Sequence, residues 1–257
     1  PVVVVMGQRA GPSTGMPTYT AQTDLMFILH AGHGEFSRFV VAPGDAEEAY
    51  EWSAIAMNKA WKYRMPAIVL IDRTIGLGLY TFDKDPTGST NEEIPVDPRY
   101  IPGKEKGYAV KANSYIHDEF GYARENPEIA KASADNLLQK EQLLADDLKD
   151  LQQVKRTGDG TTALLCWGSC KGVCLEIAAK LGLSVVKILV MSPFPNGQVA
   201  SALSGVDRVV AVECNAKGQL SMLMAQNGFP VDHKILKYDG RPFSLEELEE
   251  EVKKVMK

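Results

Sequence analysis

Residues 39–72, FVVAPGDAEEAYEWSAIAMNKAWKYRMPAIVLID, decide the fold of this chain. The stretch opens with a short β-branched run, residues 39–42, which ends at a Pro-Gly pair. It closes with a second apolar run, residues 66–71, which ends at an aspartate. Both runs have the length and the bounding residues of buried strands. A helix-length segment separates them, so the order strand, helix, strand predicts a parallel sheet covered by helices.

The segment between these two runs has the pattern of an amphipathic helix over residues 45–63. Asp45 can cap the first turn, and Glu48 occupies the reciprocal position of a capping box. Apolar residues then recur with a helical period, at Ala49, Trp52, Ala56, Ala60 and Tyr63. We therefore expect one face of this helix to pack on the sheet.

Upstream, the apolar run Val2–Val5 looks like another buried strand, and the loop Gln8–Thr18, QRAGPSTGMPT, follows it. Arg9 would lie at the carboxyl end of a parallel strand, where ligands usually bind. Two glycines and two prolines shape the loop, and a guanidinium held there suits a carboxylate or a phosphate. A structured loop with a solvated arginine is the alternative. The hydroxyls of Ser13 and Thr14 could bind a ligand or the loop's own backbone.

The composition is that of a globular chain with room for one large or two ordinary domains: 257 residues, 45% hydrophobic and 24% charged. The net charge of −5 and the lack of a basic run argue against nucleic acid as the main partner. No apolar stretch approaches the ~20 residues that span a bilayer, and no signal peptide pattern is present. The chain starts at Pro1 inside a strand-like run. Such a strand needs neighbours on both sides, so we expect upstream sequence to be missing.

The cysteines Cys166, Cys170 and Cys174 are spaced by four residues, and Cys214 follows. Thiolates at such a spacing could hold an iron–sulfur cluster. However, Cys166 ends a strand pattern and Cys174 falls inside a helix pattern, and free cysteine packs as a small buried hydrophobe. We favour buried packing. Without a secretion signal, disulfides are not expected, and a reducing cytoplasm fits.

Organisation along the chain predicts an α/β fold with two parallel-sheet domains. Residues 1–95 alternate strand and helix patterns, with a further helix expected over residues 21–31. Residues 96–157 form a linker: periodicity fades from Gly76 to Ser114, and a long charged helix over residues 126–155 bridges the domains. Residues 158–257 form the second domain. Its strands are expected at 161–166, 185–190, 208–213 and 234–237, and its helices at 171–181, 198–203, 218–227 and 244–256.

Three further segments carry residue types that could do chemistry. His117-Asp118-Glu119 could serve acid–base work or bind a metal, or Asp118 could satisfy the backbone of a turn. His30 and His33 are ligand types, but no third ligand is evident nearby. Glu213-Cys214-Asn215 lies in a strand-to-helix turn. That turn could bind an anion at the helix N-terminus or, as we favour, contact the other domain.

Taken in order, these motifs resemble the α subunit of 2-oxoacid:ferredoxin oxidoreductases. The longest and most specific is Gln8-Arg9-x-Gly11-Pro12-Ser13-Thr14-Gly15-x-Pro17-Thr18, followed by Gln22-x-Asp24-Leu25. The resemblance is colinear and spans nearly the whole chain. The other motifs are His33-Gly34-Glu35-Phe36, Ala42-Pro43-Gly44-Asp45, Asn58-Lys59-Ala60, residues 66–72, His117-Asp118-Glu119-x-Gly121, Pro193-Phe194-Pro195 and Glu213-x-Asn215-x-x-Gly218-Gln219-Leu220.

The resemblance implies a partial thiamine-pyrimidine-type domain followed by a transketolase C-terminal-like domain. It implies the coenzyme A-acylating oxidative decarboxylation of a 2-oxo acid, either 2-oxoglutarate or a broad range, with electrons passed to ferredoxin. The cofactors would be thiamine diphosphate, Mg²⁺ and [4Fe-4S] clusters, held mostly by partner subunits. Those partners would be a β-type subunit that carries thiamine diphosphate and a γ-type subunit, in the cytoplasm, with neither nucleic acid nor membrane involved.

The resemblance also implies roles for single residues. Arg9 would pair with the substrate carboxylate, Gly11, Ser13 and Thr14 would line the substrate, and Asp118 would tune substrate choice. The chain departs from the family in two features: a Tyr-Pro-x-Thr-Pro-like loop and a glutamate for the thiamine pyrimidine are both missing. The chain alone is therefore not expected to catalyse the full reaction. A non-catalytic assembly subunit of the same architecture is the alternative.

Overall fold

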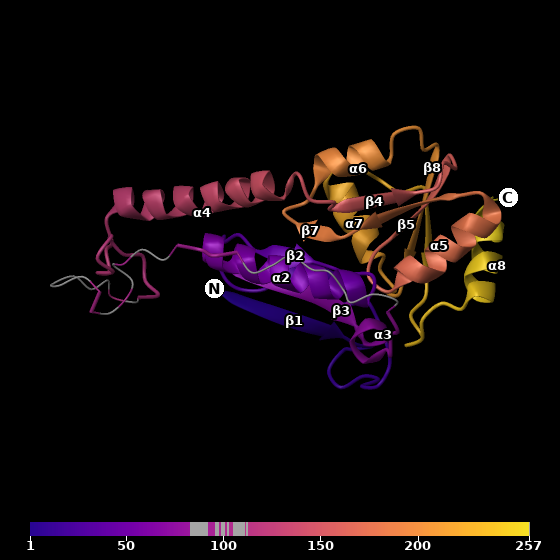
Figure 1. The fold of residues 1–257 in the computed structure, drawn as a ribbon, viewed down its shortest axis with the longest axis horizontal. Helices are drawn as coiled ribbons and strands as arrows, with labels where there is room; N and C mark the ends of the chain where they lie inside the picture. Colours follow the sequence, from indigo (N-terminus) through magenta and orange to yellow (C-terminus); the bar gives the residue numbers. More distant parts are fainter. Residues whose placement is uncertain are drawn as a thin grey trace.

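The computed structural model describes residues 1–82, 92–95, 98, 101, 103–104, 111 and 113–256, and two sheets form its framework (Figure 1). Most neighbouring strands are parallel, as predicted for the α/β class. The first sheet has the order β1 (Val2–Gln8), β3 (Pro66–Asp72), β2 (Phe39–Val41) and β7 (Val190–Ser192). The second has the order β4 (Val154–Thr157), β6 (Ser184–Ile188), β5 (Thr162–Cys166), β8 (Arg208–Glu213) and β9 (His233–Leu236).

Helices connect and cover these strands. No helix in the described part combines the length and the apolar character that are needed to cross a bilayer. The irregular segment predicted between residues 76 and 114 falls largely outside the described residues. The helices are α1 (Leu25–His30), α2 (Ala46–Tyr63), α3 (Arg73–Leu77), α4 (Pro127–Leu148), α5 (Cys170–Leu181), α6 (Asn196–Ala202), α7 (Gln219–Gln226) and α8 (Leu245–Met256).

The predicted helix after β2 is α2, and the sequence explains both of its ends. The Asp45 carboxylate accepts a hydrogen bond from the Glu48 N–H at 2.9 Å and so caps the first turn. Arg64 follows the last helical residue in the left-handed conformation, with φ 51°, and ends the helix. The predicted capping box is correct in one half only. The Glu48 carboxylate accepts from the Gly44 N–H rather than from that of Asp45.

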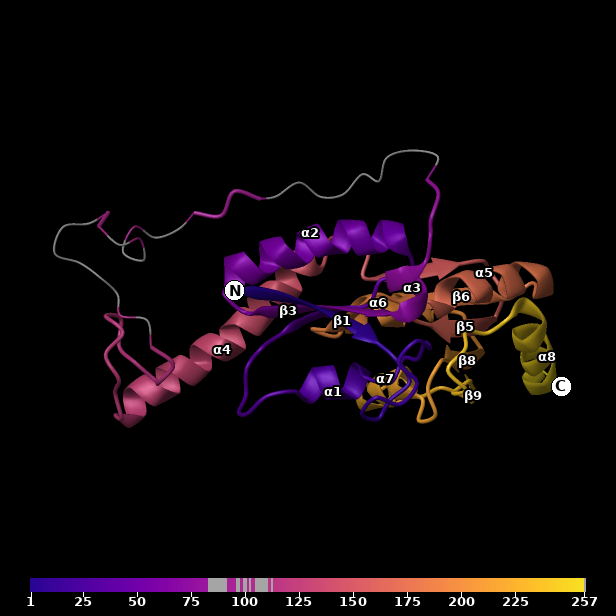
Figure 2. The same cartoon turned by 90° about the horizontal axis from the view of Figure 1, so that it is seen from below.

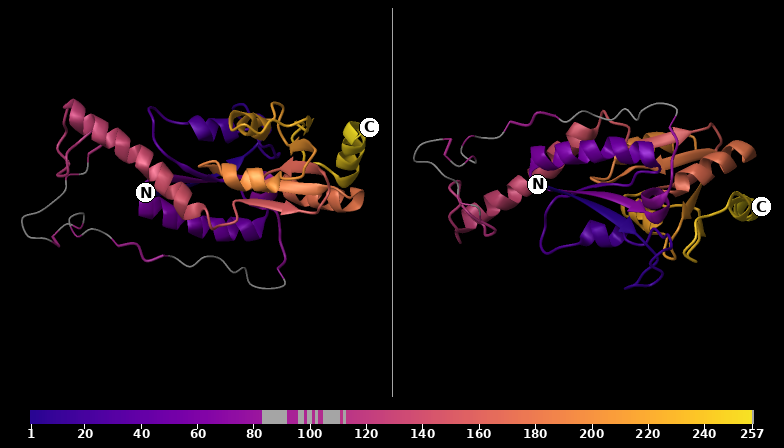
Figure 3. Two further views of the ribbon diagram at one scale, coloured as in Figure 1. Left: turned by 90° about the horizontal axis from the view of Figure 1, so that it is seen from above. Right: turned by 60° about the horizontal axis from the view of Figure 1, so that its bottom comes forward.

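Helices lie on both faces of the first sheet (Figure 2). On one face, α2 packs through Trp52 and Ala56, and α4 adds Leu144 and Leu148. On the opposite face, α1 and α7 pack through a core cluster that also includes residues of the second sheet. This shared core joins the two sheets into one body. The long helix α4 leaves that body at one end, and the C-terminal helix α8 lies at the other (Figure 3).

The strand β1 differs from prediction in its burial. We expected an interior strand, but among the described residues β3 is its only neighbour. Val2, Val4 and Val5 are 54%, 43% and 60% exposed. An apolar run predicts a strand, but it does not say which strand will stand at the edge of the sheet, because that depends on pairing with distant segments.

Three other elements differ in extent from their predictions. The long helix ends at Leu148 rather than at residue 155, because residues 154–157 pair with β6 as strand β4. The run 185–190 divides at Leu189, whose carbonyl accepts the Ala42 N–H, so β7 leaves the second sheet and pairs with β2. The helix expected over residues 21–31 begins only at Leu25.

Two strands cross the predicted domain boundaries. The strand β7 belongs to predicted domain 158–257 and pairs in the first sheet, whereas β4 belongs to predicted linker 96–157 and pairs in the second. The boundaries themselves stay predictions. In the second sheet, α5 and α8 cover one face, and α6 and α7 cover the other. All four cysteines are buried, as predicted for small hydrophobic residues.

Candidate active site

The carboxyl ends of strands from both sheets meet at one place, and the loop that carries Arg9 is built there. In the first sheet, β1 and β3 run parallel with Gln8 beside Asp72, so both end at the same edge. The turns after β5 and β8 approach this edge from the second sheet. We call the meeting place the junction. It comprises residues 20–24, 72, 167–169 and 213–219.

Gln22 is fully buried at the centre of the junction. Its Nε2 donates to the Trp167 carbonyl at 2.8 Å, and its Oε1 accepts the Cys214 N–H at 2.8 Å. Its own backbone N–H donates to the Cys214 carbonyl at 2.7 Å. A buried amide that makes this many bonds fixes the relative position of the segments it joins. Gln22 therefore ties the chain after the Arg9 loop to the turns after β5 and β8.

Asp72 ties the end of β3 to the same turns. Its carboxylate accepts from the Ser169 hydroxyl and, at 3.3 Å, from the Ile75 N–H at the start of α3. The hydroxyl groups of Thr20 and Thr74 lie beside it, 3.3 Å apart. Burial raises the pKa of Asp72, and the hydrogen bond from Ser169 partly offsets that effect. Because its oxygens are bonded within the protein, we interpret Asp72 as a structural anchor.

Both ends of the Arg9 loop, residues 9–19, are anchored. At its start, the Thr23 hydroxyl donates to the Arg9 carbonyl at 3.2 Å, and the Asp24 N–H donates to the Gln8 Oε1 at 3.0 Å. At its end, the Thr20 N–H donates to the carbonyl of Gly240 in the second domain at 2.9 Å. The loop is therefore exposed but stands on a frame built from both sheets.

The loop closes on itself in a tight turn. The Met16 N–H donates to the Ala10 carbonyl at 2.7 Å. Gly15 has φ +48°, and a Cβ there would collide with the Ala10 carbonyl oxygen, so this position requires glycine. Ser13 also adopts a positive φ, 54°. These constraints fix the path of the backbone around Arg9.

The guanidinium of Arg9 is exposed and uses one nitrogen to hold the loop, donating from Nη2 to the Ser13 carbonyl at 3.1 Å. A guanidinium has five N–H donors, and the others of Arg9 have no partner among the described residues. The hydroxyls of Ser13 and Thr14 likewise have no hydrogen-bond partner in the described part of the chain. The structure thus brings Arg9, Gly11, Ser13 and Thr14 together on one exposed loop with free donors.

Asp118 lies in a separate hairpin, residues 113–124, and its carboxylate is occupied. It accepts the N–H groups of Phe120 and Tyr122, each at 3.0 Å, and pairs with the Arg124 guanidinium at 2.6 Å. Burial would raise the pKa of Asp118, but the hydrogen bonds from Tyr122 and Arg124 hold it below its usual value. Asp118 thus satisfies the backbone of its own turn, which was the alternative interpretation of this motif.

The Asp118 hairpin and the Arg9 loop lie at opposite ends of the first sheet (Figures 1 and 2). The loop follows the end of β1, whereas the hairpin lies before α4, toward the end where β1 begins. Within this chain, Asp118 therefore does not reach Arg9. The neighbouring His117 Nδ1 lies 2.7 Å from the Tyr115 carbonyl, so its ring also bonds within the hairpin.

The turn after β8 contacts the segment that follows the Arg9 loop, which agrees with the contact role that we favoured over anion binding. The buried Glu213 carboxylate accepts the N–H groups of Leu220 and Ser221 in the first turn of α7, at 2.8 and 3.0 Å. It thereby takes the helix N-terminal donors that an external anion would need. Gln219 then donates to the Thr23 carbonyl at 2.6 Å, across the junction.

Neither the histidines nor the cysteines form a metal centre in the described residues, where no three His, Cys, Asp or Glu side chains are grouped to hold an ion. The sulfurs of Cys170 and Cys214 lie 3.7 Å apart. The hydrogen bond with Cys214 and burial raise the pKa of Cys170, and burial raises that of Cys174. A raised pKa disfavours the thiolate form that a cluster requires.

Sequence reasoning missed the residues that hold the Arg9 loop in place. Gln22 and Asp72 appeared only as members of longer motifs, because a single polar residue carries no periodic signal. The one available signal was position: Asp72 closes an apolar strand run. The buried pairing of Glu48 with two lysines was also missed, since the sequence offered only its capping role.

Comparison with known proteins gives the following matches. Residues 1–127 match the family described as pyruvate flavodoxin/ferredoxin oxidoreductase, thiamine diphosphate-binding. The whole chain is 33% identical, over 280 residues, to subunit alpha of 2-oxoacid:ferredoxin oxidoreductase 1 from Sulfurisphaera tokodaii, and it covers 45% of that relative. It is 28% identical, over 236 residues, to 2-oxoglutarate synthase subunit KorA from Methanothermobacter marburgensis. That alignment covers 84% of this chain and 63% of the relative. The chain thus spans less than half the length of the first of these relatives.

Solved structures also share the fold, and two of them illustrate this. One is 2-oxoglutarate:ferredoxin oxidoreductase from Magnetococcus marinus with 2-oxoglutarate, coenzyme A and succinyl-CoA bound. It matches with a TM-score of 0.80 and 23% identity, over 99% of this chain and 48% of that chain. The other is a split gene transketolase, with a TM-score of 0.50 and 13% identity, over 97% of this chain and 60% of that chain. These likenesses confirm the predicted fold class.

Proposed function

The chain is a homologue of the α subunits of 2-oxoacid:ferredoxin oxidoreductases, and on that premise we propose that it forms part of such an enzyme. The complete enzyme would carry out the coenzyme A-acylating oxidative decarboxylation of a 2-oxo acid and pass the electrons to ferredoxin. The acid would be 2-oxoglutarate or one of a broad range. Support for this class comes from a relative named 2-oxoglutarate synthase and a structural neighbour with 2-oxoglutarate bound.

The contribution of this chain would be to hold the substrate carboxylate. The observation that carries this proposal is the Arg9 guanidinium, exposed on an anchored loop with one nitrogen bonded to the loop itself. A planar fork with free donors can bind a carboxylate through two N–H groups. Gly11, Ser13 and Thr14 would surround the substrate. By fixing the carboxylate, Arg9 would orient the keto carbon, so its contribution to catalysis would be to position the substrate.

The described residues offer no ready place for the diphosphate and Mg²⁺ of thiamine diphosphate. No three His, Cys, Asp or Glu side chains are grouped to hold an ion in the described part of the chain. The helix N-terminus of α7, a natural place for a diphosphate, is filled by Glu213. The buried cysteines do not fit a [4Fe-4S] cluster either. We therefore assign these cofactors to partner subunits: a β-type subunit and, for the clusters, a γ-type subunit as well.

Coenzyme A and ferredoxin would meet the assembled complex rather than this chain alone. The cytoplasm is the proposed location, because buried free thiols suit a reducing compartment. Asp118 would tune substrate choice only where another subunit, or another copy of this chain, brings the hairpin to a substrate. That role stays an untested prediction, and because the carboxylate is bonded within the hairpin we favour a structural role for Asp118.

The test is Arg9→Ala in the complete enzyme, with Arg73→Ala as the control. Arg73 is also an exposed arginine at the carboxyl edge of the first sheet, but it lies outside the loop. Loss of a charge-assisted hydrogen bond costs about 2 to 3 kcal/mol, so KM for the 2-oxo acid should rise roughly 30- to 150-fold. Arg9→Lys should fall in between, since it keeps the charge and loses the fork.

The readouts are KM and kcat for 2-oxoglutarate and pyruvate, together with co-purification of the partner subunits. An unchanged KM in Arg9→Ala, with assembly intact, would refute the carboxylate role. If the assembled complex also shows no thiamine-dependent CO2 release, the chain is a non-catalytic assembly subunit instead.

A further inference from the structure

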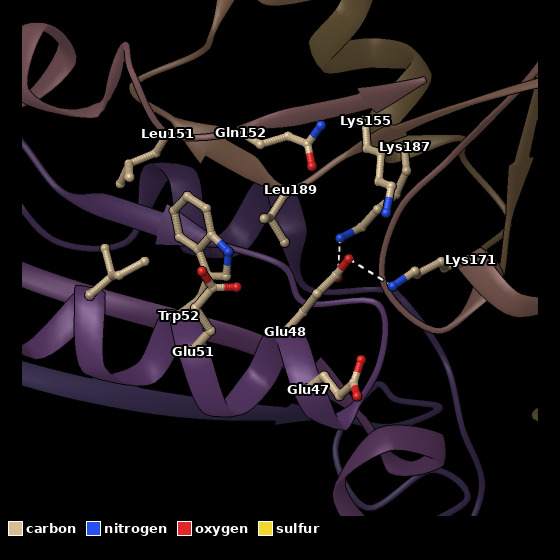
Figure 4. Close-up of a pocket in the computed structure, with 11 residues that line it drawn as sticks. Glu47, Glu48, Glu51, Trp52, Leu151, Gln152, Lys155, Lys171, Lys187 and Leu189 are labelled. Atoms are coloured by element: carbon tan, nitrogen blue, oxygen red, sulfur yellow. Dashed lines mark hydrogen bonds and ion pairs between the residues drawn. The ribbon is translucent and has the colours of Figure 1, made fainter. Parts of the chain in front are cut away.

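Four charged side chains form a network between α2 and the second domain's strands and helices, and Figure 4 shows two of them, Lys171 and Lys187, converging on the Glu48 carboxylate. Glu48, in the first turn of α2, pairs with Lys187 of β6 and, at 2.8 Å, with Lys171 of α5. Lys171 also pairs with Asp45, the N-cap residue of α2. We call Asp45, Glu48, Lys171 and Lys187 the ion network.

The network is largely shielded from water. The Lys187 side chain is 3% exposed, and those of Glu48 and Lys171 are each 16% exposed. Within the described residues, Glu48 is the only ion-pair partner of Lys187. A buried ion pair rarely adds net stability over apolar packing of the same volume, but removing one partner leaves an uncompensated charge. Such a pair therefore specifies an arrangement more than it stabilises the fold.

The arrangement that the network specifies includes the junction. The Glu48 carboxylate also accepts the Gly44 N–H at 2.7 Å. Gly44 has no room for a side chain: a Cβ there would lie 2.7 Å from the Lys171 Cδ and 3.1 Å from the Gly168 carbonyl oxygen. The start of α2 is thus pressed against the turn after β5.

That same turn holds the anchors of the Arg9 loop. Trp167 accepts from Gln22, and Ser169 donates to Asp72. A continuous series of direct contacts therefore runs from Glu48, through Gly44 and residues 167–169, to the segment that follows the loop.

We propose that Glu48, acting through Lys171 and Lys187, is a positioning residue for the Arg9 loop. The inference rests on the proposed function, because it assigns the loop a substrate to position. Without the Glu48 carboxylate, Lys187 would lose its only ion-pair partner among the described residues, while Lys171 would keep Asp45. Lys187 would then relax toward the adjoining cavity of about 270 Å³, beside Glu51 and Lys155, and the start of α2 would shift away from the turn after β5.

The chain offers a matched control on the same helix. Lys59 is also buried, 7% exposed, and pairs with Asp147 at 3.1 Å and with Glu92 at 3.2 Å. It lies in the C-terminal half of α2, and none of its partners belongs to the junction. Lys59→Met therefore removes a comparable buried cation without disturbing the path to the loop.

The experiment compares Glu48→Gln, Lys187→Met, the double variant and Lys59→Met in the complete enzyme with its partner subunits. We expect Glu48→Gln and Lys187→Met to raise KM for the 2-oxo acid roughly tenfold, as small misplacements of a binding group do. The KM for coenzyme A should change less than about twofold, because these variants misplace only the carboxylate-binding group. The double variant, which removes both charges together, should recover most of the loss. Hydrogen exchange of the Thr20 and Gln22 amides should speed up in the single variants.

Equal KM effects from Lys59→Met and Lys187→Met would overturn the inference, since they would show general destabilisation. Unchanged KM and unchanged exchange in Glu48→Gln would overturn it as well. Arg9→Ala is measured alongside to separate the two proposals. If Arg9→Ala raises KM and Glu48→Gln does not, only the positioning role fails. If Arg9→Ala has no effect on KM, the carboxylate role of the loop fails. Hydrogen exchange at residues 20–22 then still tests whether the ion network positions that segment.

Discussion

The Arg9 loop and the Asp118 hairpin are built alike and differ in what they leave available. Each contains a glycine with a positive φ where a Cβ would meet a carbonyl oxygen: Gly15 in the loop and Gly121 in the hairpin. Each also contains an arginine. In the hairpin, that arginine pairs with Asp118, and the carboxylate is further bonded by backbone N–H groups. In the loop, the one hydrogen-bond partner of the Arg9 side chain among the described residues is a carbonyl of its own turn. A charged group that makes its hydrogen bonds within its own turn stabilises the fold, whereas a charged group with free donors can bind a ligand.

The two segments also differ in what holds them. The hairpin is held largely by bonds within residues 113–124 and by the Lys111 N–H, which donates to the Phe120 carbonyl. The loop stands on a frame from distant parts of the chain, with Gln22 and Asp72 bonded to the turn after β5. Substitutions at the junction should therefore disturb the loop and leave the hairpin unchanged. The predictions below test that difference, beginning with the largest effect.

Gln22→Ala should have the largest effect on stability. The change leaves the buried Cys214 N–H and the Trp167 carbonyl without their side-chain partner. Each orphaned buried group costs about 1 to 3 kcal/mol, so we expect the free energy of unfolding to fall by roughly 3 kcal/mol. Urea unfolding measures it. Hydrogen exchange should speed up across residues 16–24 and stay unchanged in the hairpin.

The control for that variant is Gln152→Ala, which truncates an exposed glutamine. Surface changes of this kind usually stay within about 0.5 kcal/mol. If Gln22→Ala were as stable as the control, the junction would not be the frame of the loop. If the hairpin amides lost protection as well, the two segments would not be independent.

Acid should weaken the ion network through Glu48. Burial would raise the pKa of Glu48, but the charge of Lys187 and the hydrogen bonds from both lysines lower it from 4.5 to about 2. A carboxyl whose pKa is lower in the folded state stabilises the fold above its unfolded pKa, and that contribution is lost as the pH falls through the folded value. The loss should occur between pH 4.5 and about 2.

The measurement is urea unfolding of the parent chain and of Glu48→Gln across that pH range. The stability lost over that pH range amounts to roughly 2 to 3 kcal/mol. Glu48→Gln should lose about that much less stability on acidification than the parent. Parallel pH curves for the two proteins would contradict the prediction.

The helix and strands of residues 39–72 could be predicted from the sequence because their signals are local. Residues 39–72 gave a strand, a capped helix and a strand, and the structure has all three within one residue of the predicted bounds. The Ser244 and Glu247 pair at the start of α8 forms a full capping box. Caps and periodic apolar positions depend on neighbours within about four residues. They can therefore be read without knowing the fold.

Elements that depend on distant partners were not predictable in this way. The strand β4 contains Lys155 and Arg156, and only its pairing with β6 makes it a strand. The division of residues 185–190 depends on Ala42, far upstream in the sequence. For the site, the Gly-Pro composition predicted a shaped loop around Arg9. The buried residues that hold the loop gave no pattern, because their partners come from the second sheet.

Asp118→Asn should have the smallest effect and is the most direct test of the comparison. The asparagine side-chain oxygen can still accept the Phe120 and Tyr122 N–H groups, while the charge pairing with Arg124 is lost. Hydrogen exchange in the hairpin should rise slightly. In the complete enzyme, KM for 2-oxoglutarate and for pyruvate should change less than about twofold, against the rise of tens-fold expected for Arg9→Ala.

The control is Asp135→Asn on α4, which also breaks an exposed pair with an adjacent cation, Lys131. A changed ratio between the two substrates in Asp118→Asn, absent from Asp135→Asn, would break the comparison. The hairpin would then belong to a substrate site completed by another chain, and its saturated carboxylate would have to exchange a bond within its own turn for one to the substrate.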